Sequence, residues 1–125
     1  MPTQAEHTAQ AKHTREVLAT LPEAAYDWRL TMMMYAALHG INALFAKEDS
    51  TFDSTGKHYG SYASKLQKMN RNDMAAEFLS LLNASQEARY KCCGMEKLQK
   101  LIKLNEPKFD RLMTRLFQLG IDTRI

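Results

Sequence analysis

The sequence predicts an all-α fold, a bundle of four to five helices. Apolar residues recur at intervals of three and four along most of the chain, which is the spacing of a helix that buries one face. No segment alternates apolar and polar residues over the length of a strand. The 125 residues include only 5 Gly and 3 Pro, too few for the many turns of a sandwich or a barrel. We therefore expect residues 1–125 to form a single helical domain.

The first two helices are expected within residues 4–46. Residues Gln4–Leu21 are polar but rich in helix formers, so we expect segment 1–21 to be a loosely packed N-terminal helix. Pro22 and Glu23 suit the opening turn of the next helix, Glu23–Ala46. That helix is apolar over more than half of its circumference, and one of its stripes contains Trp28, Met32, Tyr35 and His39. Such a helix belongs at the centre of a bundle, or between its own chain and a partner.

The later helices follow a polar loop. Residues Lys47–Lys57 are rich in Ser, Thr, Asp and Gly and lack the spacing of a phosphate or calcium loop, so we expect a mobile connection. A short helix carries Tyr59–Met69, and a longer one runs from about Asn72 to Cys93. After Pro107 the apolar pattern resumes, and Gly120 closes the final helix.

Composition limits the possible functions and locations. The formal net charge of +3 permits an anionic partner without requiring one. No run approaches 18 apolar residues, and Met1–Gln10 does not resemble a signal peptide, so we expect a cytoplasmic protein without membrane contact. Cys92 and Cys93 are adjacent, which fits reduced thiols. Because no CxxC or HxxxH spacing is present, we expect neither a metal nor a cofactor.

Two histidines are candidate site residues. His39 lies on the apolar stripe of the long helix, where it is either a general base or a core histidine bonded to a neighbouring oxygen. His58 lies where the loop meets the short helix, and it is either a ligand-binding group or a helix cap.

Ser85 and Arg89 form a second candidate site, because they lie four residues apart on the inner face of an apolar helix. A guanidinium in such a position must pair with a carboxylate or face an anion-binding cleft. The carboxylates available for the first arrangement are Asp27, Glu48 and Asp49.

Two motifs resemble the helical HEPN domain family. The first is Trp28-x6-Tyr35-Ala36-Ala37-Leu38-His39-x3-Ala43-Leu44, followed after the loop by His58. The second is Phe78-x2-Leu81-x3-Ser85-x2-Ala88-Arg89-Tyr90. Together they cover about half of the chain. The resemblance implies a four- or five-helix bundle that forms a homodimer.

Many HEPN proteins are metal-independent endoribonucleases of toxin–antitoxin or defence systems in prokaryotes. The resemblance therefore implies RNA as the partner, with His58 and Arg89 as catalytic residues and Ser85, Tyr90 and His39 as ligand-binding residues. The family signature places a His after Arg and four to six intervening residues. This chain has Gly94, Met95 and Glu96 at those positions instead.

Three functions remain open at the level of the sequence. The first is a HEPN-like dimer that binds or cleaves RNA, with an antitoxin as a further partner. The second is a non-catalytic interaction module that recruits a nucleotidyltransferase-like protein through its Met-rich helix. The third is a nucleotide-binding domain that uses Arg89, Tyr90 and His58.

Overall fold

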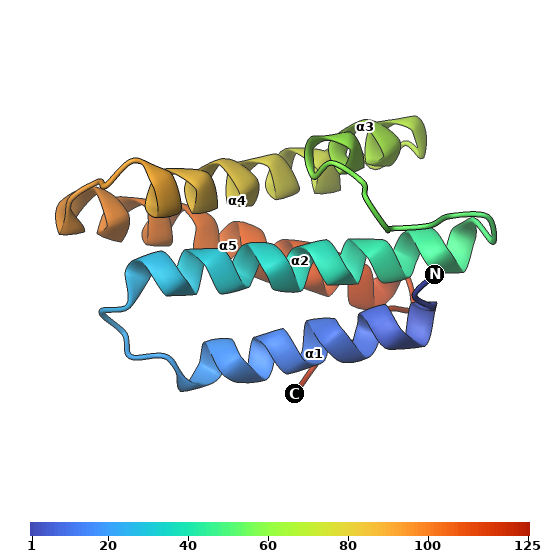
Figure 1. Cartoon of the computed structure of the whole chain (residues 1–125), viewed down its shortest axis with the longest axis horizontal. Coiled ribbons are helices and arrows are strands. Elements are labelled where there is room, and N and C mark those ends of the chain that lie inside the picture. Colours follow the sequence, from blue (N-terminus) through green and yellow to red (C-terminus); the bar gives the residue numbers. More distant parts are fainter.

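The computed structural model describes residues 1–125 and contains five helices and no strand, which confirms the all-α prediction (Figure 1). Their bounds are α1 Gln4–Thr20, α2 Tyr26–Glu48, α3 Gly60–Lys68, α4 Asn72–Tyr90 and α5 Met95–Gln118. None of the five combines the length and the apolar character that crossing a bilayer would require.

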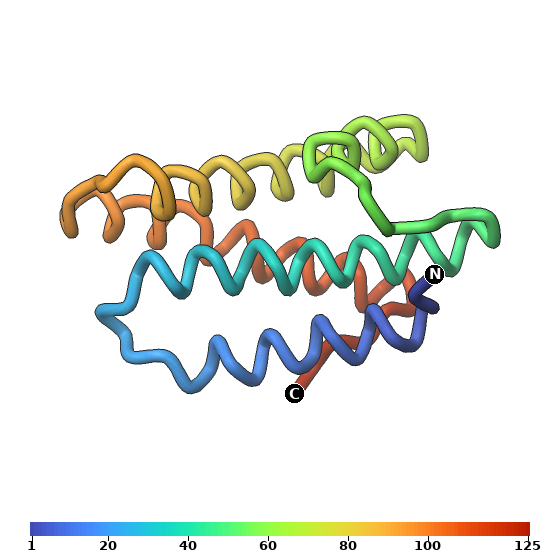
Figure 2. Tube along the Cα trace, viewed as in Figure 1, coloured from blue at the N-terminus to red at the C-terminus, as the bar shows by residue number.

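The long helix α2 lies at the centre of the bundle, as its apolar circumference predicts. It packs against α1, α4 and α5, and its residues from Leu30 to Phe45 contribute most to the core. Figure 2 shows α1 and α2 side by side and antiparallel, while α4 and α5 cover the other side of α2. Gly40 permits a close approach of α5, because a Cβ at that position would lie 2.7 Å from Leu116 Cδ1.

The polar helix α1 makes the most extensive contact with α2 of any pair of helices. It begins with a capping box, in which the Glu6 amide donates to Thr3 Oγ1 (3.1 Å) and the Thr3 amide donates to the Glu6 carboxylate (3.0 Å). Three of its residues, His7, Ala11 and Thr14, are buried. Because the buried side chains are small or polar, the apolar periodicity of this segment is weak.

Two expected helix boundaries were wrong by a few residues. The helix α2 begins at Tyr26 instead of Glu23, because Pro22 starts a turn that closes with the Ala25 amide donating to the Pro22 carbonyl (3.0 Å). The helix α4 ends at Tyr90, before Cys93, because the backbone turns into the left-handed region at Cys92 (φ 48°).

Two helices end in the same kind of turn. After α3, the Arg71 amide donates to the Leu66 carbonyl (2.8 Å) across Asn70 (φ 60°). After α5, the Ile121 amide donates to the Leu116 carbonyl (2.9 Å) across Gly120 (φ 93°), as the sequence predicts for this glycine. Both are Schellman turns, which require a residue that tolerates a positive φ.

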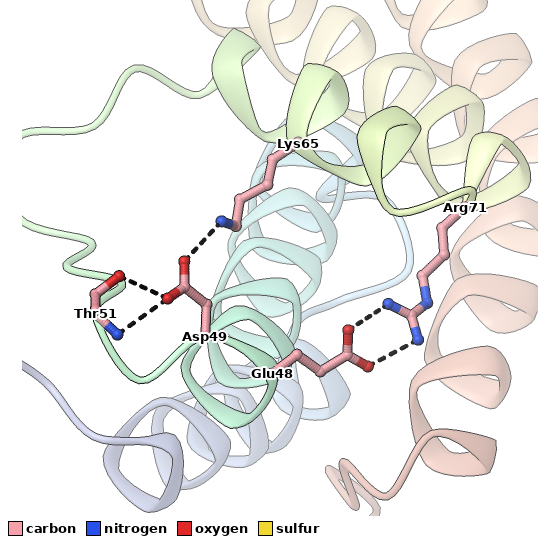
Figure 3. Close-up of polar contacts among 5 residues, drawn as sticks. All are labelled: Glu48, Asp49, Thr51, Lys65 and Arg71. Carbon is pink, nitrogen blue, oxygen red and sulfur yellow. Dashed lines mark hydrogen bonds and ion pairs between the residues drawn. The ribbon is translucent and has the colours of Figure 1, made fainter.

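The loop between α2 and α3 is held to the bundle at several points. Phe52 is buried beside Phe45, with ring centroids 5.2 Å apart. Figure 3 shows Lys65 of α3 donating to Asp49 (3.2 Å), whose other carboxylate oxygen accepts from the amide and hydroxyl of Thr51. These contacts hold the loop and α3 at the C-terminal end of α2, while α3 itself packs against α4.

Candidate anion-binding site

Arg89 lies in the last turn of α4 and is half-buried. Its Nε donates to the Ser85 carbonyl (3.2 Å), its Nη2 to the Ser85 hydroxyl (3.3 Å) and its Nη1 to the Tyr35 hydroxyl (3.3 Å). No carboxylate lies within 4.0 Å of the guanidinium. A guanidinium has five N–H groups, so two of them have no partner within the chain.

The three carboxylates that could have neutralised Arg89 do not pair with it. Glu48 accepts two hydrogen bonds from Arg71 (2.6 and 2.7 Å), and Asp49 accepts from Lys65 (Figure 3). Asp27 forms no ion pair. The ion pair that the sequence allowed is therefore not formed, and the partners of Arg89 within the chain are neutral oxygens.

Ser85 fixes the position of the guanidinium from within α4. It is fully buried, and its hydroxyl donates to the Leu82 carbonyl (2.8 Å) while accepting from Arg89. Because residues four apart lie above one another on a helix, the Arg89 side chain folds back along α4 toward Ser85. Ser85 is thus a positioning residue, with no free surface of its own for a ligand.

Aromatic rings surround the guanidinium. Its carbon lies 5.8 Å from the Tyr35 ring centroid and 5.1 Å from that of Tyr90, both within the range of cation–π contacts. Tyr59 packs edge-on against Tyr35, with centroids 6.4 Å apart. Burial raises the pKa of the Tyr59 phenol, and the nearby Tyr35 raises it further, so the phenol is neutral at physiological pH. We call Arg89, Tyr35, Tyr59 and Tyr90 the Arg89 cluster.

Exposed apolar side chains lie at the same end of the bundle. Tyr90, at the end of α4, is 70% exposed, and Trp28, in the first turn of α2, is 59% exposed. Met95 begins α5 and is 55% exposed. Figure 1 shows that the start of α2, the end of α4 and the start of α5 meet at one end of the molecule. The Arg89 cluster therefore borders a surface with large, exposed π faces.

His39 lies one turn of α2 beyond Tyr35 and is half-buried. Its Nδ1 is 3.5 Å from Nδ1 of His7, whose Nε2 is 3.0 Å from the Ser54 hydroxyl. Burial lowers the pKa of both imidazoles, and the neighbouring His7 lowers that of His39 further. Both rings are therefore neutral at pH 7, and this contact joins α2 to α1 and to the loop before α3.

A cavity of about 250 Å³ lies between α1 and α2 beside His39. His13 and Thr14 line it from α1, while Met32, Tyr35 and His39 line it from α2. Tyr35 thus contributes both to this cavity and to the Arg89 cluster. Tyr35 therefore contacts Arg89 and also lines the cavity that His39 lines.

His58 is exposed, and its ring has no hydrogen-bond partner in the chain. Its backbone carbonyl accepts from the Ser61 hydroxyl (2.6 Å) at the start of α3. Because Tyr59 follows it directly, His58 lies at the edge of the Arg89 cluster, but no contact joins it to Arg89. The structure thus brings Ser85, Arg89 and Tyr90 together, whereas neither His39 nor His58 contacts Arg89.

Tyr35, Tyr59 and His7 were not expected as site residues. Tyr35 could have been found, because it lies one turn before His39 on the stripe that includes Trp28 and Met32. His7 carries no such signal, because its polar helix shows no apolar face and its partner is 32 residues away. No group of three or more His, Cys, Asp or Glu side chains is arranged to hold a metal ion.

Comparison of the chain with family models, with curated proteins and with solved structures gives no match.

Proposed function

We propose that this chain binds single-stranded RNA at the Arg89 cluster. One observation carries the proposal: the guanidinium has no carboxylate partner and lies among tyrosine rings at the surface. Proteins that bind single strands combine a cation for the phosphate backbone with aromatic rings on which bases stack. Tyr90 and Trp28 provide exposed rings at the same end of the bundle.

The binding of a short, labelled single-stranded RNA, measured by fluorescence anisotropy, tests this proposal. Loss of a charge-assisted contact of roughly 1.5–3 kcal/mol weakens binding by about 10- to 100-fold, and we expect this for Arg89→Ala. The matched control is Arg111→Ala, which removes the same charge from an arginine that already pairs with Glu77 (3.3 Å). An Arg89→Ala variant that binds as tightly as the unmodified chain would falsify the assignment.

Two further measurements separate RNA binding from its alternatives. The slope of log affinity against log salt concentration falls by about 1 when a phosphate contact is lost, so Arg89→Ala should show a shallower slope than Arg111→Ala. Tyr90→Ala should weaken binding while leaving the salt slope unchanged, because stacking involves no counterion. A mononucleotide that binds as tightly as a 12-mer would favour a nucleotide-binding domain instead.

We also propose cleavage of that RNA, because the neutral imidazole of His39 lines the same cavity as Tyr35 of the cluster. The pKa of His39 is lowered by burial, so at pH 7 its ring can accept the proton of a 2′-hydroxyl. The 2′-oxygen would then bond to the adjacent phosphorus while the bond from phosphorus to the 5′-oxygen breaks. The products would be a 2′,3′-cyclic phosphate and a 5′-hydroxyl that takes its proton from water. Arg89 would hold the phosphate, whose charge increases in the transition state. His58, exposed at the edge of the cluster, is the second imidazole of the first HEPN-like motif and is the alternative proton acceptor.

Cleavage of the same RNA in the presence of EDTA tests this second function. We expect His39→Ala to abolish cleavage and to reduce RNA binding only slightly, whereas Arg89→Ala reduces both. His13 lines the same cavity, so His13→Ala is the control for a local change in packing. Full activity of His39→Ala with loss of activity in His58→Ala would move the catalytic role to His58.

The resemblance to HEPN domains leads us to propose a cytoplasmic homodimer in a bacterial toxin–antitoxin or defence system. The half-buried Met32 and Tyr35, which lie on one stripe of α2, support a contact between copies through that face. Sedimentation at tens of micromolar tests this, and a species of about the monomer mass of 14.3 kDa would contradict it. In that case we propose that the same face of α2 contacts an antitoxin or a nucleotidyltransferase partner.

A further inference from the structure

A second group of cations lies around α3. Residues 54–72 contain no Asp or Glu. The same stretch carries Lys57, Lys65, Lys68 and Arg71. A local excess of one charge attracts ligands of the other sign, so this part of the surface favours anions.

A cavity of about 330 Å³ lies within this group. Three of the lysines line it, together with the hydroxyls of Ser61 and Ser64. The aromatic rings of Phe52 and Tyr62 also line it, and both are buried in the core, which gives the cavity a rigid apolar wall. No carboxylate is among the lining residues. Ammonium and hydroxyl donors around one small cavity match the acceptor oxygens of a phosphate group.

Two of the four cations already have partners. Arg71 donates to both oxygens of Glu48, and Lys65 donates to Asp49, as Figure 3 shows. Lys57 and Lys68 are exposed and have no carboxylate within 4.0 Å. The ammonium groups of these two lysines are therefore available to a ligand.

The hydroxyls of Ser61 and Ser64 can form further hydrogen bonds to a ligand as well. Ser61 Oγ donates to the His58 carbonyl (2.6 Å) and keeps its lone pairs, while the Ser64 hydroxyl has no partner in the chain. Asp53, the carboxylate nearest in sequence to Lys57, accepts from the Thr55 amide (3.0 Å). This bond lowers the pKa of Asp53, and the charge of Lys57 lowers it further. Three lysines line the cavity and no carboxylate does, so the cavity keeps a net positive charge.

We propose that this α3 pocket binds a terminal phosphate group, either inorganic phosphate or the phosphomonoester at the end of a nucleic acid. A phosphomonoester carries about −1.5 to −2 charges at pH 7, so two free lysines favour it over the single charge of a phosphodiester. Tyr59 packs against Tyr35 and lies in the sequence between Lys57 and Ser61, so it connects the segment that lines the pocket to the Arg89 cluster. An RNA strand bound at Arg89 would place its phosphorylated end in the α3 pocket. This RNA end as the source of the phosphate rests on the proposed function, whereas the binding of inorganic phosphate does not.

The first experiment uses inorganic phosphate alone, so it does not depend on RNA binding. In amide NMR spectra of the whole chain, phosphate should cause saturable shifts at residues 57–68. The double variant Lys57→Gln/Lys68→Gln should lose them. The control Lys97→Gln/Lys100→Gln removes two exposed lysines of α5 that pair with Glu87 and Glu96, and it should keep the shifts. Absence of saturable shifts in the unmodified chain, or equal shifts in both double variants, would overturn the proposal.

The second experiment identifies the source of the phosphate. Two RNAs of the same sequence, one with a 5′-phosphate and one with a 5′-hydroxyl, are compared by anisotropy. We expect the phosphorylated RNA to bind at least about tenfold more tightly, and the α3 double variant to remove this difference. Arg89→Ala should weaken both RNAs equally and leave the ratio unchanged. Saturable phosphate shifts without a difference between the RNAs would support inorganic phosphate as the ligand, and they would overturn the RNA end as its source.

Discussion

Replacing Arg89 by alanine should cost little stability, although the side chain is half-buried on the inner face of α4. The change removes three hydrogen bonds to neutral oxygens, at 3.2–3.3 Å. The Ser85 hydroxyl keeps its bond to the Leu82 carbonyl, and no carboxylate is left unpaired. Bonds of this length lie at the weak end of the usual range, and the two cation–π contacts of Arg89 lie at the surface. We therefore expect the free energy of unfolding to fall by about 1–2 kcal/mol.

Arg71→Ala provides the matched comparison. Arg71 donates to both oxygens of Glu48 at 2.6 and 2.7 Å, and its side chain is only 16% exposed. Its removal leaves Glu48 unpaired at the C-terminal end of α2, where the helix dipole disfavours a negative charge. Charge-assisted bonds contribute roughly 1.5–3 kcal/mol, so we expect Arg71→Ala to be the less stable variant.

Urea denaturation measures both changes. With a slope of about 1–3 kcal/mol per molar urea, a loss of 1 kcal/mol lowers the midpoint by roughly 0.3–1 M. A loss of about 3–5 kcal/mol for Arg89→Ala is the value typical of breaking a buried ion pair. That result would refute the reasoning, because it would mean that a carboxylate neutralises Arg89 in solution.

Two further predictions concern the core and the histidines. Gly40→Ala gains about 1 kcal/mol of helix propensity but meets Leu116 Cδ1, and overpacking costs about 1–3 kcal/mol, so we expect a net loss of up to about 2 kcal/mol. In a Leu116→Ala background the same change should stabilise by about 1 kcal/mol, and additive effects in urea denaturation would contradict this contact. His7 and His39 have lowered pKa values, so the unfolded chain binds more protons than the folded one below about pH 6.5. The free energy of unfolding is therefore highest above that pH and falls as the pH drops toward 5. An equal urea midpoint at pH 7.5 and 5.5 would argue against the buried pair. So would a fall in the midpoint that persists in the His7→Gln/His39→Gln variant.

Much of the fold could be predicted from the spacing of apolar residues. The central position of α2 follows from its apolar circumference, and the end of α5 follows from Gly120. The start of α2 could not be predicted from the sequence, because Pro22 suits both the first turn of a helix and the turn that precedes a helix. Pro107 does not interrupt α5, and the Lys103 carbonyl that loses its bond is on an exposed residue where water can satisfy it.

The candidate site could be predicted only where its residues share one helix. Ser85 and Arg89 lie four apart on α4, so their contact follows from helix geometry. The contacts of Arg89 with Tyr35, and of His39 with His7, join residues 54 and 32 positions apart. Such contacts depend on how helices pack, which a single sequence does not specify. The lack of a carboxylate beside Arg89 is likewise a property of the assembled bundle.

The left-handed turn at Cys92 gives the molecule a natural labelling site. Cys92 is exposed, whereas Cys93 is partly buried and its thiol donates to the Glu87 carbonyl (3.6 Å). A maleimide fluorophore should therefore react first at Cys92, two residues beyond Tyr90, without any engineered cysteine. A dye at that position reports directly on what approaches the exposed rings at this end of the bundle.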